Sequence, residues 1–506
     1  MKRLHMIGTM ILVVGLCSSA SAESDEFVWR DHLSLSVSDR LRGEFVSWFD
    51  PAGPKSNNNY NFFANRARVG ATLSFPTVEF VVEGQDTEMV NLPGADSINS
   101  GPGTANLGTL GPGALYFTNT HTRDQGEVFL HLGYATLRAF GLPGVSARVG
   151  RFGYNSGLEK PAHDPTVLWL QRSRISQRLI GNFDYTNVGR SFDGVQAAYD
   201  RGPLNVTLMG SHPTFGGFNV NANKEIDQID LVAGTVSVVE PEAMAPTSAQ
   251  FFYMYYGDRR GLIATDNRTR DLPAGQTCST GNNRYLIRNC DHSDIAISTI
   301  GIDAIHVVDI GSGKMDVLVW VAGQFGDWQA LGQNAWAYVT EAGYQLTDVA
   351  WKPWLRLGFA RASGDQDKTD HDHNTFFQMI PTARLYALFP FYNMMNNQDL
   401  FAQGIVRPLP GLSVTTSGHW LRATESADLW YSGGGATSNT FFGYAGIATR
   451  GRHELSYLAD LEISYTINSH LTCYAYYGRA LGQAIASANF AGTNADYGYI
   501  ETTVSF

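Results

Sequence analysis

Apolar and ionisable side chains alternate with a period of two along several segments, and this pattern is the strongest constraint on the fold. In residues 454–467, Leu455 and Leu461 belong to the apolar set, whereas Glu454 and Asp460 belong to the charged set. Because successive side chains of a β-strand point to opposite faces, the pattern predicts strands with one apolar and one charged face. The same alternation occurs in residues 33–45, 66–75 and 78–85. Such strands suit a soluble β-sandwich with charged faces in water, or a membrane barrel with charged faces towards its lumen.

The segment 497–506 favours the barrel. One face carries Gly498, Ile500, Thr502, Val504 and Phe506, and the other carries Tyr499, Glu501, Thr503 and Ser505. A final strand with an apolar face and an aromatic last residue is typical of the assembly signal of bacterial outer-membrane barrels. We therefore expect the charged faces of the strands to line a lumen.

Residues 1–22 predict an export signal. Lys2 and Arg3 precede an apolar stretch, residues 7–17, that is too short to span a bilayer as a helix, and residues 20–22 read Ala-Ser-Ala. A positive start, a short apolar run and a small-residue cleavage site define a secretory signal peptide. We expect a mature chain from about Glu23, a single barrel domain over residues 23–506, and a location in the cell outer membrane.

Composition and loop lengths agree with this fold class. The sequence has 53 Gly, 23 Tyr, 28 Phe and 10 Trp, which suits barrel turns and aromatic girdles at the membrane interfaces. Short connectors such as residues 75–77 and 142–144 suit periplasmic turns, and long ones such as 84–126, 257–294 and 363–376 suit external loops. The lengths of strands and loops alone allow an all-β antiparallel barrel of about 14 to 18 strands. The formal charge of −11 and the absence of a basic domain argue against nucleic-acid binding.

Cys278 and Cys290 flank a polar stretch that contains Gly281 and two asparagines. An exported protein folds in an oxidising compartment, where cysteines at such spacing commonly pair. We therefore expect a disulfide between them that braces an external loop without a catalytic role.

A second polar segment contains Asp370, His371, Asp372 and His373. One interpretation is a divalent-cation site, because carboxylate oxygens and imidazole nitrogens are metal ligands. The other is a solvated acidic loop, bridged through cations to lipopolysaccharide, and we favour it because the spacing matches no known metal cage.

Arginine accounts for 29 of the 36 basic residues. Arg66, Arg68 and Arg356 lie by parity on the polar faces of predicted strands, and so do Arg40 and Arg42. Guanidinium groups in a narrow, low-dielectric lumen attract anions and repel cations. Acidic residues on neighbouring polar faces could neutralise them, so the residues leave two hypotheses open: an anion-selective pore and a charge-balanced general pore.

The sequence offers little support for catalysis. It contains no G-x-S-x-G segment and no glycine-rich phosphate loop. We therefore expect a channel without a cofactor, and keep a membrane-embedded lipid-modifying enzyme as an alternative. A third hypothesis is a porin for hydrophobic solutes, with a path lined by Phe389, Phe391, Tyr392, Met394 and Met395, although an interfacial aromatic belt explains these residues more simply.

Residues 177–195, which read QRLIGNFDYTNVGRSFDGV, resemble the bacterial alginate-export outer-membrane channel family. That family has a Q-R-L motif followed closely by an Arg-x-Phe-Asp-Gly segment, matched here by Arg178, Arg190, Phe192, Asp193 and Gly194. Weaker matches are residues 81–85, 148–152, 452–455, 463–472 and 477–478.

The resemblance implies a monomeric barrel of about 18 strands whose arginine-lined constriction passes a polyuronate outwards. It also implies lipid and lipopolysaccharide around the barrel and periplasmic export components as partners. The residues that we assign to the constriction are Arg66, Arg68, Arg151, Arg178, Arg190, Asp193, Arg356, Arg452 and Glu454. Arg151 and Asp193 share parity with Val149 and Val195, which should face lipid, so a bulge or a strand end is expected there.

Overall fold

The computed structural model describes residues 32–50, 58–95, 111–138, 141–242, 244, 246–268, 291–382 and 386–506. The expected export signal and the expected disulfide between Cys278 and Cys290 lie outside these residues. No helix among the described residues is long and apolar enough to cross a membrane.

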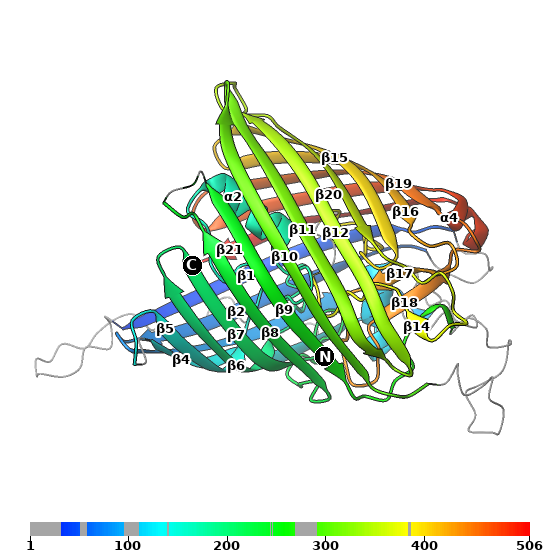
Figure 1. Ribbon diagram of the computed structural model, residues 1–506, viewed down its shortest axis with the longest axis horizontal. Helices are drawn as coiled ribbons and strands as arrows, with labels where there is room; N and C mark the ends of the chain where they lie inside the picture. Colours follow the sequence, from blue (N-terminus) through cyan, green and yellow to red (C-terminus); the bar gives the residue numbers. More distant parts are fainter. Residues whose placement is uncertain are drawn as a thin grey trace, which may run out of the picture.

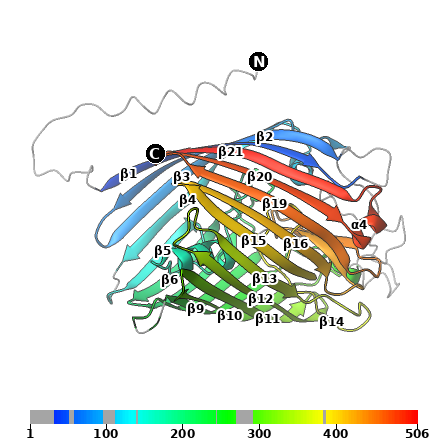
Figure 2. The same ribbon diagram turned by 90° about the horizontal axis from the view of Figure 1, so that it is seen from above.

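Among the described residues, eighteen antiparallel strands close into a barrel. Figures 1 and 2 show the barrel from two sides. In chain order they are β1 (Leu33–Ser47), β2 (Asn59–Ser74), β3 (Val78–Val90), β4 (Gln125–Arg138), β5 (Val145–Phe152), β6 (Phe192–Arg201), β7 (Leu204–Pro213), β8 (Ile229–Val239), β9 (Thr247–Asp258), β10 (Ile295–Ile310), β11 (Gly313–Trp328), β12 (Leu331–Leu346), β13 (Trp354–Ala362), β15 (Asn397–Leu409), β16 (Leu412–Ala423), β19 (Glu454–Thr466), β20 (Leu471–Gly482) and β21 (Asn494–Ser505). Each strand pairs with the next in this order, and β21 pairs with β1 from Ser38↔Ser505 to Ser47↔Asp496. The predicted fold class is confirmed.

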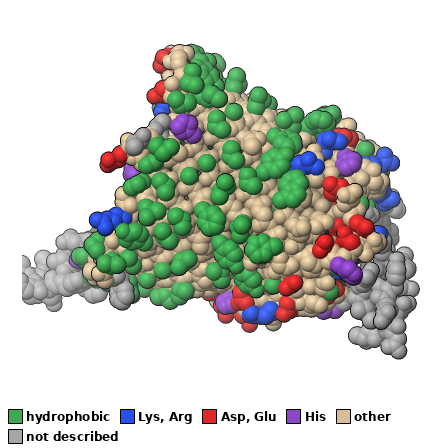
Figure 3. Space-filling view, viewed as in Figure 1, with side chains coloured by type: hydrophobic (Ala, Val, Ile, Leu, Met, Phe, Trp, Pro, Cys, Tyr) green, Lys and Arg blue, Asp and Glu red, His purple; other side chains and the backbone are tan. Residues whose placement is uncertain are grey.

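The two-residue alternation places apolar side chains outside and polar side chains inside. On β10, for example, Ile300 and Ile302 are exposed on the outer wall, while Thr299 and Asp303 on either side of them are buried. Figure 3 shows hydrophobic side chains across the outer wall, with most charged side chains near its ends. This distribution matches a wall that faces hydrocarbon, because a charged group there has no water to solvate it.

Connectors at one end of the barrel are short, and most of those at the other end are long. The short ones include residues 75–77, 202–203 and 311–312, and the long ones include 153–191, 363–396 and 424–453. The C-terminus lies at the end with the short turns, since β21 ends there beside the start of β1 (Figure 2). By the general plan of outer-membrane barrels, short turns are periplasmic and long loops are external.

Parts of the long loops fold into the lumen. The long loops carry α1 (Pro112–Thr120), α2 (Pro165–Leu170), a π-helical turn (Gln171–Ile175), β14 (Asp372–His373), the hairpin of β17 (Leu429–Gly433) and β18 (Tyr444–Ala448), and, at the rim of the barrel, α4 (Ala484–Asn489). Leu170, Ile180 and Met379 of these loops belong to one buried cluster with wall residues such as Met254 and Trp320. The interior is therefore filled largely by the chain's own loops, without a separate plug domain among the described residues.

Helix α2 illustrates how local sequence sets a loop element. Asp164 precedes the helix, and its carboxylate accepts hydrogen bonds from the backbone N–H groups of Thr166 and Val167. Pro165 follows at the first helical position, where its missing N–H costs nothing. These residues fix the start of the helix.

The outer wall predicts a depth-dependent cost for a buried charge. Ile302, near the middle of β10, is 55% exposed on the outer wall, and Ile310 at the periplasmic end of the same strand is 47% exposed. Ile302→Arg should lower the free energy of unfolding by about 2 to 4 kcal/mol, and Ile310→Arg by at most about 1 kcal/mol. Denaturant titration in lipid vesicles measures both, and equal losses would contradict the assigned membrane depth.

Candidate functional site

Four arginines gather on one part of the inner wall. Arg40 on β1 and Arg66 and Arg68 on β2 point into the lumen, and Arg40 lies directly opposite Arg66 in the strand register. Arg42 on β1 is buried and shares the inward face of Arg40. We call these four residues the arginine row. Like charges in opposite positions on paired strands repel each other, so the row needs compensating groups.

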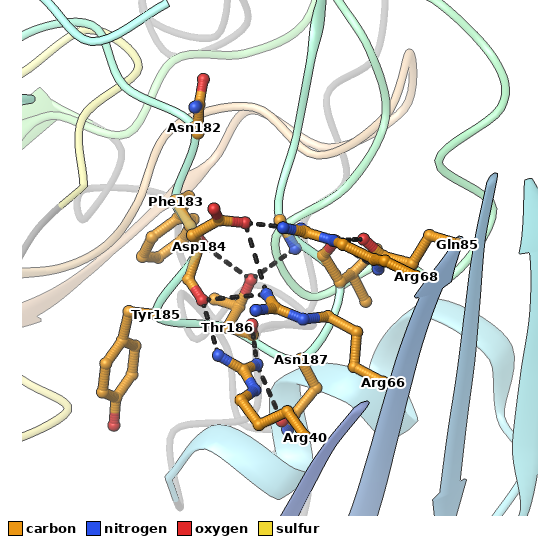
Figure 4. A network of polar contacts seen from close by, with 12 residues as sticks. Arg40, Arg66, Arg68, Gln85, Asn182, Phe183, Asp184, Tyr185, Thr186 and Asn187 are labelled. Atoms are coloured by element: carbon orange, nitrogen blue, oxygen red, sulfur yellow. Dashed lines mark hydrogen bonds and ion pairs between the residues drawn. The ribbon is translucent and has the colours of Figure 1, made fainter. Parts of the chain in front are cut away.

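Residues 182–187, from the loop between β5 and β6, supply much of this compensation (Figure 4). Asp184 Oδ1 accepts hydrogen bonds from Arg68 at 2.7 Å and from Arg66 at 3.3 Å. Backbone carbonyl oxygens add to this, because Asp184 O accepts from Arg40 at 2.9 Å and Thr186 O accepts from Arg40 at 2.6 Å. The segment therefore meets the row with one carboxylate and several peptide dipoles.

The charge state of Asp184 follows from its position. Partial burial raises its pKa, but the guanidinium groups of Arg68 and Arg66 outweigh this effect and hold the pKa well below its usual range. Asp184 is consequently ionised, and it is the carboxylate that pairs with Arg66 among the described residues.

Tyrosines continue the wall next to the arginine row. Tyr497 and Tyr499 lie on β21, which pairs with β1, and Tyr474 and Tyr476 lie on β20, the next strand. We call these four residues the tyrosine row. The guanidinium carbon of Arg42 lies 4.5 Å from the centroid of the Tyr499 ring. Strands β2, β1, β21 and β20 thus present cationic groups and aromatic rings side by side.

Tyr185 connects the loop segment to both rows. Its carbonyl oxygen accepts a hydrogen bond from Arg42 at 2.7 Å. Its hydroxyl lies 2.5 Å from the hydroxyl of Tyr497, and its ring contacts that of Tyr499 edge-on at 6.0 Å. A carbonyl, a hydroxyl and an aromatic ring of one residue therefore contact this wall together.

A second charged cluster lies on β11, β12 and β13. Arg356 donates hydrogen bonds to Asp316 at 2.5 Å and to Glu341 at 2.8 Å, and its side chain is 0% exposed. Arg174, from the π-helical turn, lies 3.5 Å from the same Glu341 carboxylate. Tyr386 also donates to Glu341, at 2.9 Å. Arg356 is therefore held by two buried carboxylates.

Arg178 and Arg190 lie in the same loop between β5 and β6, on either side of residues 182–187. Arg178 donates to the Tyr386 hydroxyl at 2.7 Å and lies 4.9 Å from the Trp320 ring centroid. Arg190 donates to the backbone oxygen of Gly434 at 2.7 Å, and burial lowers its pKa to about 10. Neither is paired with a carboxylate among the described residues, and neither contacts the arginine row.

Comparison with known proteins supports the architecture. A family model described as alginate export matches residues 31–485. The chain belongs to the alginate export family. A search of curated proteins finds no match.

Solved structures of outer-membrane proteins share the barrel. OccAB2 from Acinetobacter baumannii superposes with a TM-score of 0.55 at 11% identity, covering 93% of this chain and 98% of that one. OpdK from Pseudomonas aeruginosa with vanillate superposes with a TM-score of 0.52 at 10% identity, covering 93% of this chain and 98% of OpdK. A BenF-like porin from Pseudomonas fluorescens Pf-5 superposes with a TM-score of 0.52 at 10% identity, covering 94% of this chain and 98% of the porin. At these identities the likeness concerns the fold. Together with the family, it makes the chain an outer-membrane barrel of the channel type.

The family motifs around Arg151 and Asp193 lie elsewhere on the barrel. The two side chains form a two-point ion pair, with contacts of 2.7 and 2.6 Å. Pairing of β5 and β6 is unbroken, so both residues keep the parity of Val149 and Val195, whose side chains are exposed on the outer wall. The expected strand end is present, but it does not turn the pair towards the arginine row. Arg151 also donates hydrogen bonds to the backbone oxygen of Asn223 at 3.0 Å and to its side-chain oxygen at 3.2 Å.

The motif around Arg452 and Glu454 also departs from the expectation. A register shift between β16 and β19 interrupts the alternation at the start of β19. Leu455 consequently joins the buried cluster, and Glu454 accepts hydrogen bonds from Arg422 at 3.0 Å and Trp420 at 3.1 Å. Arg452 is exposed in the turn before the strand. Both residues thus lie at the external end of the strands, away from the lumenal rows.

The four residues considered as metal ligands are not brought together. His373 is buried and stacks on Trp328 at 4.0 Å, and burial lowers its pKa to about 3. Asp370, His371 and Asp372 are exposed. Within the described ranges, no group of three or more His, Cys, Asp or Glu side chains is placed to hold a metal ion. The geometry agrees better with a solvated loop, whose last histidine is part of the lumenal core.

Sequence reasoning missed Arg174, Asp184 and Tyr185. Residues 182–187 have no periodic pattern, so parity gives them no direction. The available signal in the sequence was the arginine row itself. Four guanidinium groups on neighbouring strands require anionic partners, so acidic residues from elsewhere in the chain were to be expected close to them.

The Arg356 cluster predicts a large loss of stability for a single substitution. Arg356→Met would leave the Asp316 and Glu341 carboxylates without their main buried cation, and should cost about 3 to 5 kcal/mol. Arg479→Met is the matched control, because Arg479 is 48% exposed and lies 3.4 Å from Asp496, so its loss should cost under about 1 kcal/mol. Denaturant unfolding of both variants in the same lipid checks the difference, and a similar cost for both would contradict it.

The external loop after β13 predicts a pH effect on stability. Burial and the neighbouring Asp428 carboxyl raise the pKa of Asp365 from 3.8 to about 7. Between these values the folded protein retains a proton that the unfolded chain releases, so stability falls as the pH rises through this window. Asp365→Asn should reduce that fall, which thermal unfolding at about pH 4 and about pH 7 measures. Asp372→Asn, at an exposed position of the same loop, should leave the pH dependence of the wild type unchanged.

Proposed function

We propose that the protein is a passive outer-membrane channel for anionic solutes, and that its principal solute is an alginate-like polyuronate. The observation that carries this proposal is the arginine row, whose guanidinium groups bind a carboxylate and peptide carbonyls inside the lumen. Guanidinium groups bind carboxylates through charged, directional hydrogen bonds, so the same groups suit the carboxylates of a solute. Membership of the alginate export family supports the choice of a polyuronate.

Acidic neighbours moderate the attraction. Glu501 lies 2.5 Å from Arg42, and Glu83 lies 3.8 Å from Arg68. A channel needs binding that is favourable enough for a solute to enter and weak enough for it to leave. We interpret these carboxylates as groups that hold the arginines in place and reduce their affinity for a passing anion.

The proposal requires no bond-making step and no cofactor. The solute moves down its concentration gradient, and the protein acts as a monomer with its apolar wall in lipid and its long loops beside lipopolysaccharide. Periplasmic export components would deliver the polymer to the end with short turns. A lipid-modifying activity remains the less favoured hypothesis.

A second candidate solute is a small aromatic carboxylate. The tyrosine row next to Arg42 favours it, because an aromatic ring could stack there while its carboxylate meets a guanidinium. Vanillate, with which the similar barrel OpdK was crystallised, is a molecule of this class. The two solutes are separable, since a polymer should block the channel for longer than a single ring.

Single-channel reversal potential across a KCl gradient tests the proposal. The wild type should prefer anions and be blocked by oligouronates, more strongly than by vanillate or by neutral oligosaccharides. The double variant Arg66→Gln, Arg68→Gln should lose most of the anion preference and weaken the block by about tenfold or more, because charged hydrogen bonds to the solute are lost.

Arg138→Gln is the control for this experiment. Arg138 pairs with Glu79 at the periplasmic end of β4 and its side chain is 44% exposed. Its substitution removes one positive charge outside the arginine row and should leave the block unchanged. A wild-type channel with weak selectivity and no block would exclude polyuronate transport and favour a charge-balanced general pore.

A further inference from the structure

Residues 184–187 lie on the arginine row in the way that an anionic ligand would. The carboxylate of Asp184 bridges Arg66 and Arg68. The carbonyl oxygens of Asp184, Tyr185 and Thr186 receive guanidinium hydrogen bonds from Arg40 and Arg42 over 2.6 to 2.9 Å. All four members of the row are therefore occupied by one short piece of chain.

We infer that residues 184–187 compete with the transported solute for the arginine and tyrosine rows. A solute that carries a carboxylate on a ring must displace these residues before it can pass. This inference rests on the proposed function, because it takes the arginine row as the binding surface of the solute. It adds the chemical class that the surface selects and the step that opens it.

The groups on the segment indicate that class. Asp184 and Tyr185 are adjacent, and together they place a carboxylate on Arg66 and Arg68 and a six-membered ring against Tyr499. A uronate unit carries a carboxylate and hydroxyl groups on a six-membered ring. A chain of such units could therefore supply carboxylates to the arginine row, ring faces to the tyrosine row and hydroxyl groups in place of the Tyr185 hydroxyl.

The contacts of the segment suggest where exchange begins. The Asp184 side chain is 43% exposed, whereas Thr186 and Asn187 are buried. Asn187 is held more firmly, because its N–H donates to Tyr116 at 2.9 Å and its amide donates to Glu44 at 3.1 Å. An incoming carboxylate can therefore reach Arg66 and Arg68 at the Asp184 end first and then lift the rest of the segment.

The backbone next to Asp184 supports an exchangeable segment. Phe183 has a φ of 53°, a left-handed conformation that a bulky residue adopts at an energetic cost. The contacts of residues 184–187 with the arginine row offset this cost. When a solute takes over the arginines, the segment can relax, which lowers the free energy needed for displacement.

Asp184→Asn provides the first test, in the same single-channel experiment. The variant removes the charged competitor while preserving side-chain size, so anion preference should rise and oligouronates should block at about tenfold lower concentration. Asp164→Asn is the matched control, because Asp164 lies in the same loop but pairs with Lys314 at 3.3 Å, and Asn also suits a helix N-cap. It should behave as the wild type.

Cysteine labelling provides the second test and separates displacement from a simple change of charge. The protein used for labelling carries Cys278→Ser, Cys290→Ser and Cys473→Ser, so that its native cysteines do not react. Thr186→Cys is introduced into this variant, which is then treated with a charged, water-soluble maleimide. Thr186 is 1% exposed, so labelling should be slow, and oligouronates should accelerate it several-fold by lifting the segment.

Two controls accompany the labelling. Neutral maltooligosaccharides should leave the rate at position 186 unchanged, because they bring no carboxylate. Thr166→Cys reports on a buried residue of α2 in the same loop, and oligouronates should not change its rate. Unchanged labelling at position 186 with oligouronates would overturn the displacement step.

The outcomes distinguish the two proposals. In one outcome, the wild type is anion-selective and is blocked by oligouronates, but Asp184→Asn and Asp164→Asn show the same anion preference and block, and oligouronates do not change the labelling rate at position 186. This outcome would overturn the inference that residues 184–187 compete with the solute and would leave the proposed function intact. In the other outcome, the wild type shows neither anion preference nor block by oligouronates, and Asp184→Asn increases neither. This outcome would overturn both the proposed function and the inference about residues 184–187.

Discussion

The hydrogen-bonded contact between β1 and β21 is the interaction on which the rest of the structure depends. In hydrocarbon an open sheet edge leaves backbone groups without partners, so a membrane sheet must close on itself. Here Val37 and Phe506 exchange backbone hydrogen bonds of 3.1 and 2.8 Å at the start of that contact. Closure also brings the arginine row on β1 and β2 beside the tyrosine row on β21 and β20, although these strands lie at opposite ends of the chain (Figure 2).

The density of positive charge on this wall then shapes the lumen. Arg40 and Arg66 face each other across two paired strands, an arrangement that is unfavourable without anions close by. Glu501 supplies one such anion. The loop segment that contains Asp184 supplies another (Figure 4). Folding stability and the proposed transport thus use the same contacts, since any group that compensates the arginines also competes with a solute for them.

Alternation along the strands correctly predicted which side chains enter the lumen where pairing is regular. Arg66, Arg68 and Arg356 were placed inside in this way, and the structure has them there. The prediction for Glu454 was wrong because a register shift at the start of β19 reverses the parity, which no local pattern reveals. The family motif led us to assign Arg151 and Asp193 to the constriction, but unbroken pairing of β5 and β6 keeps both residues away from the arginine row.

The sequence by itself determined the barrel, its polar lumen and the inward arginines, because a strand's two faces follow from residue order alone. It could not determine the path of the long loops, which have no repeating pattern to give their side chains a direction. Only the tertiary structure decided that Asp184 and Tyr185 lie on the arginine and tyrosine rows. The physical reason is that these contacts join residues more than a hundred positions apart, such as Arg68 and Asp184, and form only once the barrel has closed around the loop.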